Sequence, residues 1–500
     1  MSAHDNEYDL LIIGGGINGA GIAADASGRG LKVLLCEQND LASATSSNSS
    51  KLIHGGLRYL ENYQFRLVRE ALREREVLLK KAPHIMWPLS FRLPHQAHLR
   101  SPWMIRMGLF IYDHLAWRNT LPASKAIEFN SDSVLNSSIT QGFEYADGWV
   151  DDARLVILNA QAAHNLGATI ATRTRCIKAT RNADYWDVIL EQQASKQHLN
   201  IKAKSVVNAA GPWVASLFED VFTQPTPHTI RLVKGSHIVV PRLHNEPAAY
   251  ILQNKDNRIV FVIPYEQDYS LIGTTDEEYI GDITDVKISE QEIEYLISIT
   301  NHYFKKPISE ADIVHTFSGV RPLLDDKSTD AQAVTRDYKL ILNNDTDHAA
   351  LLSVFGGKIT TYRKLAENAV NKLAPFYPKM SGSWTKDAPL PGGDFSNQTY
   401  LTAQLESSYP WLAIDTLKRM VRSYGTLSYQ LLGNSQSIGD LGYHFGHGLY
   451  AQEVDYLVNH EWARTSADIL WRRTKLGLRF SEKQVIALGQ YLTKHPACHS

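Results

Sequence analysis

The first residues that could do chemistry are three glycines and an acid near the start of the chain. The pattern Gly14-x-Gly16-x-x-Gly19 follows a short apolar run and opens a helical stretch rich in small residues. These glycines permit a tight turn, let the backbone approach a pyrophosphate and let the helix lie close to the strand. The pyrophosphate would meet free N–H groups at the helix N-terminus. A second apolar run ends in Glu37, which is placed to bind a ribose hydroxyl and would repel a 2′-phosphate. The pattern predicts a dinucleotide site that disfavours NADP.

Two further segments are expected to lie along the same cofactor. The Ser/Thr-rich run 41–50 is typical of a linker, but a linker is improbable inside a dinucleotide domain, so we interpret it and the following 51–61 as a cofactor loop. A second turn, Gly356-Gly-Lys-Ile-Thr360, suggests that one long cofactor is held from both ends. This arrangement favours FAD over NAD.

No other catalytic motif competes with the dinucleotide. The sequence has no GxSxG, no HExxH, no phosphate-binding P-loop and no metal-spaced cluster. We therefore expect the cofactor to supply the hard chemistry and expect no metal.

Cations in the motif loops could bind an anionic substrate. Arginine offers a bidentate fork to a phosphate dianion, and the candidates are Arg58, Arg321, Arg336 and Lys358. Each of them alone is more often a surface or ion-paired residue. Lys358 could instead lie by the flavin N1–C2 oxygen, where a cation stabilises the reduced anion.

Alcohol oxidation also needs a proton acceptor, for which histidine is suited. His237 and His54 are the candidates, although most of the 19 histidines must be structural. Tyr59 and Thr274 are candidate hydrogen-bond partners for the substrate or flavin.

The elements that position these residues suggest several domains. A length of 500 residues predicts roughly two to four domains. The β-rich runs 236–241, 258–264 and 269–275 follow one another without helices, which indicates an antiparallel sheet. A Pro/Gly/Ser-rich segment, 381–394, is typical of a linker and precedes a helical C-terminal part. Three scattered cysteines fit a reducing compartment, and a net charge of −2 makes nucleic acid an improbable partner.

The segment Ser101–Trp117 has two readings. It is apolar around most of its circumference but too short to span a bilayer. One reading is a buried core helix. The other is an interfacial helix, with its aromatics at headgroup level and Met104, Ile105, Leu109 and Ile111 in the acyl boundary. No signal peptide or transmembrane run is evident in the sequence.

Four long motifs carry a family resemblance. The stretches 14–21, 45–61, Ser318-Gly-Val-Arg-Pro-Leu323 and 355–364 together resemble the FAD-dependent glycerol-3-phosphate dehydrogenases, and the likeness continues to Asp468–Lys475. The length and the absent targeting peptide resemble those of the bacterial respiratory enzyme. The resemblance implies oxidation of sn-glycerol 3-phosphate to dihydroxyacetone phosphate, with hydride transfer to FAD and electrons passed to ubiquinone or another quinone. It also favours His237 as the base.

The resemblance implies an α/β fold of the D-amino-acid-oxidase-like class. Residues 1–90, 145–220 and 330–385 would form a discontinuous Rossmann-type FAD domain, residues 91–144 and 221–329 an inserted antiparallel-sheet substrate domain, and residues 386–500 a helical C-terminal domain. The residues expected to contact the cofactor are Gly14, Gly16, Ile17, Asn18, Gly19, Glu37, Thr45, Ser46, Ser47, Lys51, Leu52, His54, Gly55, Gly56, Ala210, Gly211, Gly357, Lys358, Ile359 and Thr360.

The same resemblance implies peripheral attachment to the cytoplasmic side of the inner membrane, with some protein in the cytoplasm. The oligomeric state, a homodimer included, stays open. Three other functions also stay open: a glycerol-3-phosphate oxidase that uses O₂, another amine or 2-hydroxy-acid oxidase of this fold, and a flavin-binding sensor without turnover.

Overall fold

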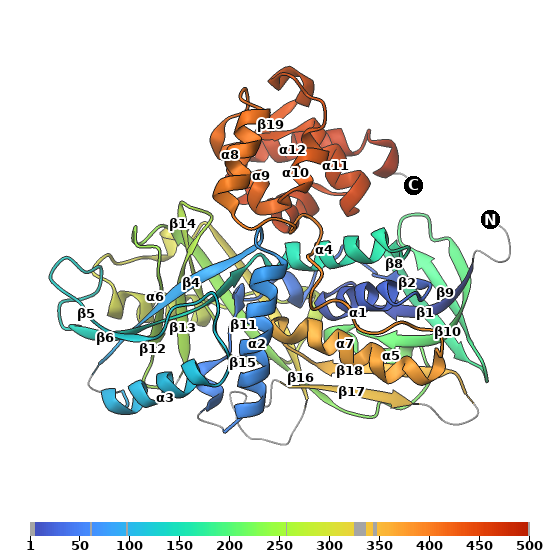
Figure 1. The fold of residues 1–500 in the computed structure, drawn as a ribbon, viewed down its shortest axis with the longest axis horizontal. Coiled ribbons are helices and arrows are strands. Elements are labelled where there is room, and N and C mark those ends of the chain that lie inside the picture. Colours follow the sequence, from blue (N-terminus) through green and yellow to red (C-terminus); the bar gives the residue numbers. More distant parts are fainter. Residues whose placement is uncertain are drawn as a thin grey trace.

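Two large sheets lie side by side and a group of helices packs above them (Figure 1). The computed structural model describes residues 6–60, 63–96, 99–256, 258–324, 337–343 and 348–498. The architecture confirms the predicted combination of a Rossmann-type domain, a second and mainly antiparallel sheet, and a helical C-terminal region.

The first sheet is the dinucleotide-binding one. Its order is β17-β18-β10-β1-β2-β7, with β9 on β10 and β8 on β9. The central pairs β1–β2, β1–β10 and β10–β18 are parallel, and Leu10, Leu11 and Ile12 are fully buried because helices or strands cover both faces. The strands are β1 (Glu7–Ile13), β2 (Val33–Cys36), β7 (Thr169–Ala171), β8 (Thr174–Arg181), β9 (Trp186–Gln192), β10 (His198–Asn208), β17 (Tyr338–Asn343) and β18 (Ala350–Gly356).

Helices α1 (Ile17–Gly28), α4 (Asp152–Asn165) and α7 (Tyr362–Leu373) pack together against this sheet. α1 begins in direct contact with the turn that precedes it. A Cβ at Gly19 would lie 1.9 Å from the Gly14 carbonyl oxygen, so only glycine fits there. The third glycine of the motif therefore has the close-packing role that its spacing predicts.

The second sheet has the order β15-β11-β14-β13-β12-β4-β6-β3, with β16 on β11 and β5 on β6. Its pairs are antiparallel, as predicted, except that β4 and β12 are parallel. The strands are β3 (Leu52–Ile53), β4 (Met86–Pro94), β5 (Lys125–Glu128), β6 (Gln141–Val150), β11 (Ile230–Pro241), β12 (Ala249–Gln253), β13 (Ile259–Tyr265), β14 (Tyr269–Gly273), β15 (Glu277–Glu278) and β16 (His315–Leu324). The helices in this part are α2 (Phe65–Lys81), α3 (Pro102–His114) and α6 (Glu290–Tyr303), while α5 (Ser216–Asp220) follows the first sheet's β10.

Two predicted domain boundaries need correction. β4 and β6 pair continuously from Met86↔Val150 to Pro94↔Gly142, so both strands belong entirely to the second sheet. The boundaries predicted at 90 and 145 fall inside these strands and would split one hydrogen-bonded ladder. They move to before Met86 and after Val150.

The C-terminal region contains α8 (Gln398–Ser408), α9 (Ile414–Tyr424), α10 (Leu427–Leu432), α11 (Ala451–Glu461) and α12 (Glu482–Leu492), with a small hairpin of β19 (His444–Gly446) and β20 (Leu449–Tyr450). These elements share one hydrophobic core. A π-helical turn, Asp468–Arg473, connects α11 to the last helix.

Helix α3 is not a core helix. Only Leu109 and Tyr112 of the helix are buried, whereas Trp103 is 63%, Met107 53% and Phe110 58% exposed. The expectation that Leu109 enters a membrane is wrong, because its side chain is fully buried in the core of the second sheet. The outward face is therefore a different one, with Trp103, Met104, Met107, Phe110 and Ile111.

Candidate active site

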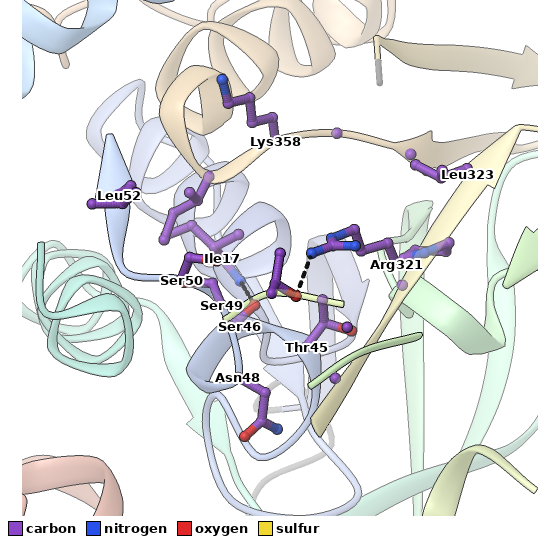
Figure 2. Close-up of a pocket in the computed structure, with 18 of the residues that line it drawn as sticks. Ile17, Thr45, Ser46, Asn48, Ser49, Ser50, Leu52, Arg321, Leu323 and Lys358 are labelled. Atoms are coloured by element: carbon purple, nitrogen blue, oxygen red, sulfur yellow. Dashed lines mark hydrogen bonds between the residues drawn. The ribbon is translucent and has the colours of Figure 1, made fainter. Parts of the chain in front are cut away.

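One cavity of about 1090 Å³ runs between the two sheets. This volume lies slightly above the roughly 300–1,000 Å³ typical of ligand pockets. Its walls come from the β1–α1 turn, the Ser/Thr-rich loop, the end of β10, strands β11 and β16, and the turn after β18. Figure 2 shows Ser46 of the Ser/Thr-rich loop beside Ile17, with Thr45 toward Arg321.

The β1–α1 turn fits a pyrophosphate. Gly14 has φ +115°, and a Cβ there would lie 2.5 Å from the Ala209 carbonyl oxygen. Gly16 is the N-cap of α1 and supplies no side chain to the first turn. The Ile17 amide donates to Ser46 Oγ at 3.0 Å, which brings the Ser/Thr-rich loop against the helix N-terminus (Figure 2). Backbone amides and a serine hydroxyl thus converge where a phosphate would be stabilised.

Glu37 is fixed at the end of β2. One carboxylate oxygen accepts from the Gly15 amide at 2.7 Å and the other from the Asn39 amide at 2.8 Å. Burial raises the pKa of this carboxyl, and the two amides oppose the rise. Glu37 lines the cavity, and each carboxylate oxygen can accept a second hydrogen bond, as a ribose diol would require.

A second glycine turn lies beside the first turn of α1. Gly356 and Gly357 have φ +72° and +105°, and Asn18 Nδ2 donates to the Gly356 carbonyl at 3.3 Å. Asn18 Oδ1 is buried without a hydrogen-bond partner among the described residues. An orphaned acceptor on the cavity wall fits a ligand that carries a hydrogen-bond donor. The cavity wall therefore has polar groups at Asn18 as well as at Glu37.

Lys358 follows this turn. Its Nζ donates to the His54 carbonyl at 2.6 Å and lies 5.3 Å from the centre of the Tyr59 ring. The His54 amide in turn donates to Thr360 Oγ1 at 3.3 Å. Lys358 and Thr360 thus hold the 54–56 loop against the turn, and Lys358 still lines the cavity.

Arg321 is the cation at the substrate-domain side. Its Nη1 pairs with Asp276, and its Nη2 donates to Thr274 Oγ1 at 3.2 Å. All three residues line the cavity. A Cβ at Gly235 would lie 2.5 Å from Thr274 Oγ1 and 2.7 Å from Arg321 Nη2, so this glycine leaves the space that the pair occupies.

His237 lies one layer behind the cavity wall. Its Nε2 shares a hydrogen bond of 2.9 Å with Ser50 Oγ, and its ring stacks on Phe317. Burial, followed by the positive charges of Arg321 and Lys51, holds its pKa well below the ordinary value. The imidazole is therefore neutral at neutral pH and reaches the cavity through Ser50, which lines it.

Behind this cluster, Glu292 connects three elements. From the first turn of α6, its carboxylate pairs with Lys234 at 2.8 Å and accepts from Ser236 Oγ at 2.9 Å and Thr275 Oγ1 at 2.7 Å. Burial alone would raise the pKa of this carboxyl, but these bonds and the Ser289 amide hold it below its usual range. Glu292 thus fixes Thr275, the residue between Thr274 and Asp276.

The structure brings most of the predicted site residues together. The cavity is lined by Gly14, Gly16, Ile17, Asn18, Glu37, Thr45, Ser46, Leu52, His54, Gly56, Tyr59, Ala210, Gly211, Thr274, Arg321, Gly357, Lys358 and Ile359. Arg336 and the side chain of Arg58 lie outside the described residues. The roles predicted for the lining residues, and for Arg336 and Arg58, stay predictions.

Several predicted contact residues do not line the cavity: Gly19, Ser47, Lys51, Gly55, Thr360 and the catalytic candidate His237. For Lys51 the reason is a buried ion pair. Its Nζ lies 2.7 Å from Asp152 Oδ1 and donates to the Ser47 carbonyl at 3.0 Å. The ammonium group therefore fixes the back of the loop, and a cofactor contact by Lys51 stays a prediction.

Sequence reasoning missed Ser50, Gly235, Asp276 and Glu292. Asp276 had a weak signal, since an acid directly follows the polar end of a strand at Thr274-Thr275. Glu292 had only the signal of a capping box with Ser289, which indicates a helix start and nothing more.

Comparison with known proteins adds two family matches. Residues 9–363 match the family described as FAD dependent oxidoreductase, and residues 383–490 match the C-terminal domain of alpha-glycerophosphate oxidase. The first match spans both sheets and the whole cavity wall.

Individual relatives cover nearly the whole chain. A glycerol-3-phosphate dehydrogenase of Pseudomonas aeruginosa is 56% identical over 98% of this chain and 96% of its own. A D-erythritol 1-phosphate dehydrogenase of Brucella abortus is 49% identical over 98% of each. The solved structure of the glycerol-3-phosphate dehydrogenase from Bacillus halodurans complexed with FAD has a TM-score of 0.73 and 25% identity, covering 98% of this chain and 94% of that one.

Proposed function

This chain belongs to the FAD-dependent oxidoreductase family, and from that premise we propose that it oxidises sn-glycerol 3-phosphate to dihydroxyacetone phosphate. The cofactor is FAD, and the Gly14 turn, Glu37 and the Gly357 turn are the residues that would hold it. The choice of substrate rests on the position of Arg321, whose guanidinium lies on the cavity wall beside Thr274. A forked cation suits a phosphate monoester.

The residues of the chain bind the substrate phosphate and accept the hydroxyl proton. FAD, when bound, supplies the acceptor for the hydride that leaves C2 of the substrate. Arg321 and the Thr274 hydroxyl bind the phosphate and so orient the carbon chain. The hydroxyl proton passes to Ser50 Oγ as the Ser50 proton passes to the neutral His237 Nε2. Burial and the charges of Arg321 and Lys51, which lower the pKa of His237, disfavour the imidazolium, so His237 is a weak base here. Loss of one hydride and one proton converts the alcohol to the ketone.

A second candidate substrate follows from one relative. The Brucella abortus enzyme acts on D-erythritol 1-phosphate and is 49% identical to this chain. Both substrates are polyol phosphates, so the same cationic anchor serves either. The two differ in carbon-chain length, which the end of the cavity remote from Arg321 must accommodate.

For the electron acceptor we propose a membrane quinone, reached at the cytoplasmic face of the inner membrane. The same cavity continues to Met104, Ile105, Met107 and Ile111 of α3, so an apolar acceptor can enter from that helix. Among the described residues, no helix has the length and apolarity needed to cross a bilayer. The exposed apolar face of α3 supports peripheral attachment instead.

The experiment uses the purified yellow holoenzyme under anaerobic conditions. Glycerol 3-phosphate should bleach the flavin absorption with an apparent second-order rate constant of flavin reduction at least about tenfold above that of D-erythritol 1-phosphate. Glycerol should bleach it far more slowly. A preference for D-erythritol 1-phosphate would overturn the choice of substrate. Stoichiometric peroxide on turnover in air, without reduction of added quinone, would make the protein an oxidase.

A further inference from the structure

The C-terminal helical region lies directly against the cofactor loop. The motif Asp468–Lys475, which the function does not use, contacts the segment that follows β2. Residues 37–39 and 42–44 of that segment line the cavity, whereas Asp40 points away from it. The C-terminal region therefore contacts the loop from its outer side.

Asp40 is held by two arginines of that region. Its Oδ2 lies 2.6 Å from Arg472 Nε and 2.5 Å from Arg473 Nη1, and its Oδ1 accepts from Arg473 Nη2 at 2.9 Å. The Asp40 side chain is 2% exposed and that of Arg473 is fully buried. A buried, bidentate pair of this kind fixes its partners in one geometry, because losing either partner leaves a buried charge uncompensated.

A second connection runs through Arg173. Its amide donates to the Asn39 carbonyl at 2.9 Å, and its guanidinium lies 2.5 Å from Asp468 Oδ2. The next residue, Thr174, donates its amide to the Glu37 carbonyl at 2.8 Å. The Glu37 and Asn39 carbonyls are thus held by the turn between β7 and β8, and Arg173 of that turn pairs with the C-terminal motif.

Asp468, the partner of Arg173, is held in place by its own hydrogen bonds and ion pairs. It accepts from the backbone amides of Arg464 and Thr465 at 2.8 and 2.9 Å and is paired with Arg472. Although burial alone would raise the pKa of Asp468, the charges of Arg473, Arg173 and Arg472 hold it at about 2. The anion persists throughout the physiological pH range.

We propose that the C-terminal helical region positions the dinucleotide, with Arg473 and Asp40 as the positioning residues that hold Glu37 in place. The region contributes no described residue to the cavity wall, so it acts on FAD through the 37–44 loop. This inference concerns retention of FAD and is independent of which polyol phosphate is oxidised.

The test measures the dissociation constant of FAD from the full-length holoenzyme by the recovery of flavin fluorescence on dilution. Arg473→Met should weaken FAD binding about tenfold or more, which corresponds to about 1.4 kcal/mol. Asp40→Asn should have a similar effect. Because both changes break the same contact, the double variant should bind FAD only slightly more weakly than either single variant.

Arg419→Met is the matched control. Arg419 pairs with buried Glu453 at 2.6 Å within the C-terminal region and touches no residue of the loop. It should lower the melting temperature about as much as Arg473→Met while FAD affinity stays unchanged. If Arg473→Met fails to fold, Arg472→Met, whose side chain is 17% exposed, replaces it. Unchanged FAD affinity in the Arg473 or Arg472 variant, or an equal loss in the Arg419 control, overturns the proposal.

Discussion

Replacing Arg321 by methionine tests the proposed anchor for the substrate phosphate. The change removes the guanidinium that pairs with Asp276 and donates to Thr274, and keeps an apolar stem of similar length. The kcat/KM for glycerol 3-phosphate should fall strongly, because the phosphate loses a charge-assisted contact. Glycerol, which lacks the phosphate, should lose little.

The magnitude follows from the exposure and geometry of the side chain. A hydrogen bond to a charged group is worth about 1.5–3 kcal/mol, and about 1.4 kcal/mol corresponds to a factor of ten in rate. The Arg321 side chain is 25% exposed, so solvent screening places the effect at the lower end of that range. One lost contact thus predicts about a tenfold decrease, and two predict about a hundredfold decrease.

Asp276 gives the experiment a second arm. In Arg321→Met the Asp276 carboxylate loses the guanidinium and faces the incoming phosphate dianion, so repulsion adds to the loss. The double variant Arg321→Met/Asp276→Asn removes that repulsion and should recover part of the kcat/KM.

The assay is dye-linked turnover with FAD content measured in each preparation. Arg231→Met is the control, because Arg231 lies on β11 opposite Leu323 of β16, pairs with Glu278 and does not line the cavity. An equal loss for glycerol and glycerol 3-phosphate would refute the phosphate role of Arg321. A double variant no better than the single one would refute the repulsion by Asp276.

Two further predictions concern the membrane and pH. Trp103→Glu/Phe110→Glu should release the enzyme from vesicles containing phosphatidylglycerol while dye-linked activity stays intact, because neither residue lines the cavity. The control Ile280→Glu changes a more exposed apolar residue outside α3 and should stay bound, and retention of the double variant would place the membrane contact elsewhere. Burial lowers the pKa of His84 to about 3, so the unfolded chain takes up the proton first and the free energy of unfolding decreases as the pH falls below about 6.5. Below that pH, His84→Gln should reduce the slope of the free energy of unfolding against pH by about 1.4 kcal/mol per pH unit, measured in denaturant titrations. The control His198→Gln, at an exposed site, should leave this slope unchanged. Equal slopes for the two variants would contradict the assignment to His84.

The parts of the fold that the sequence predicts well are the local ones. The β1–α1 turn is encoded by three glycines within six residues, and Glu37 follows from the length of one βαβ unit. The phosphate-binding turn and the ribose-binding acid both depend on backbone geometry and on short sequence distances. For the same reason the apolar runs 258–264 and 269–275 locate β13 and β14 to within two residues, although β11 begins six residues before the run 236–241.

The residues that sequence reasoning missed depend on long-range pairing. Asp276 and Arg321 are 45 residues apart, and they meet because β11 pairs with both β15 and β16. The sequence of α3 is compatible with both a core helix and an interfacial helix for a related reason. An apolar helix can bury or expose its second face, and only the position of the neighbouring sheet decides which.

Strand β11 shows how the two ends of the site are coupled. Ser236 and His237 are adjacent, so their side chains leave the strand on opposite faces. Glu292 of α6 holds Ser236 on one face, while Ser50 of the cofactor loop meets His237 on the other. A shift of the strand by one residue would exchange the faces and break both contacts. The pairing of His237 with Gly273 and Phe317 fixes that register, and it therefore sets the distance between the substrate anchor and the cofactor loop.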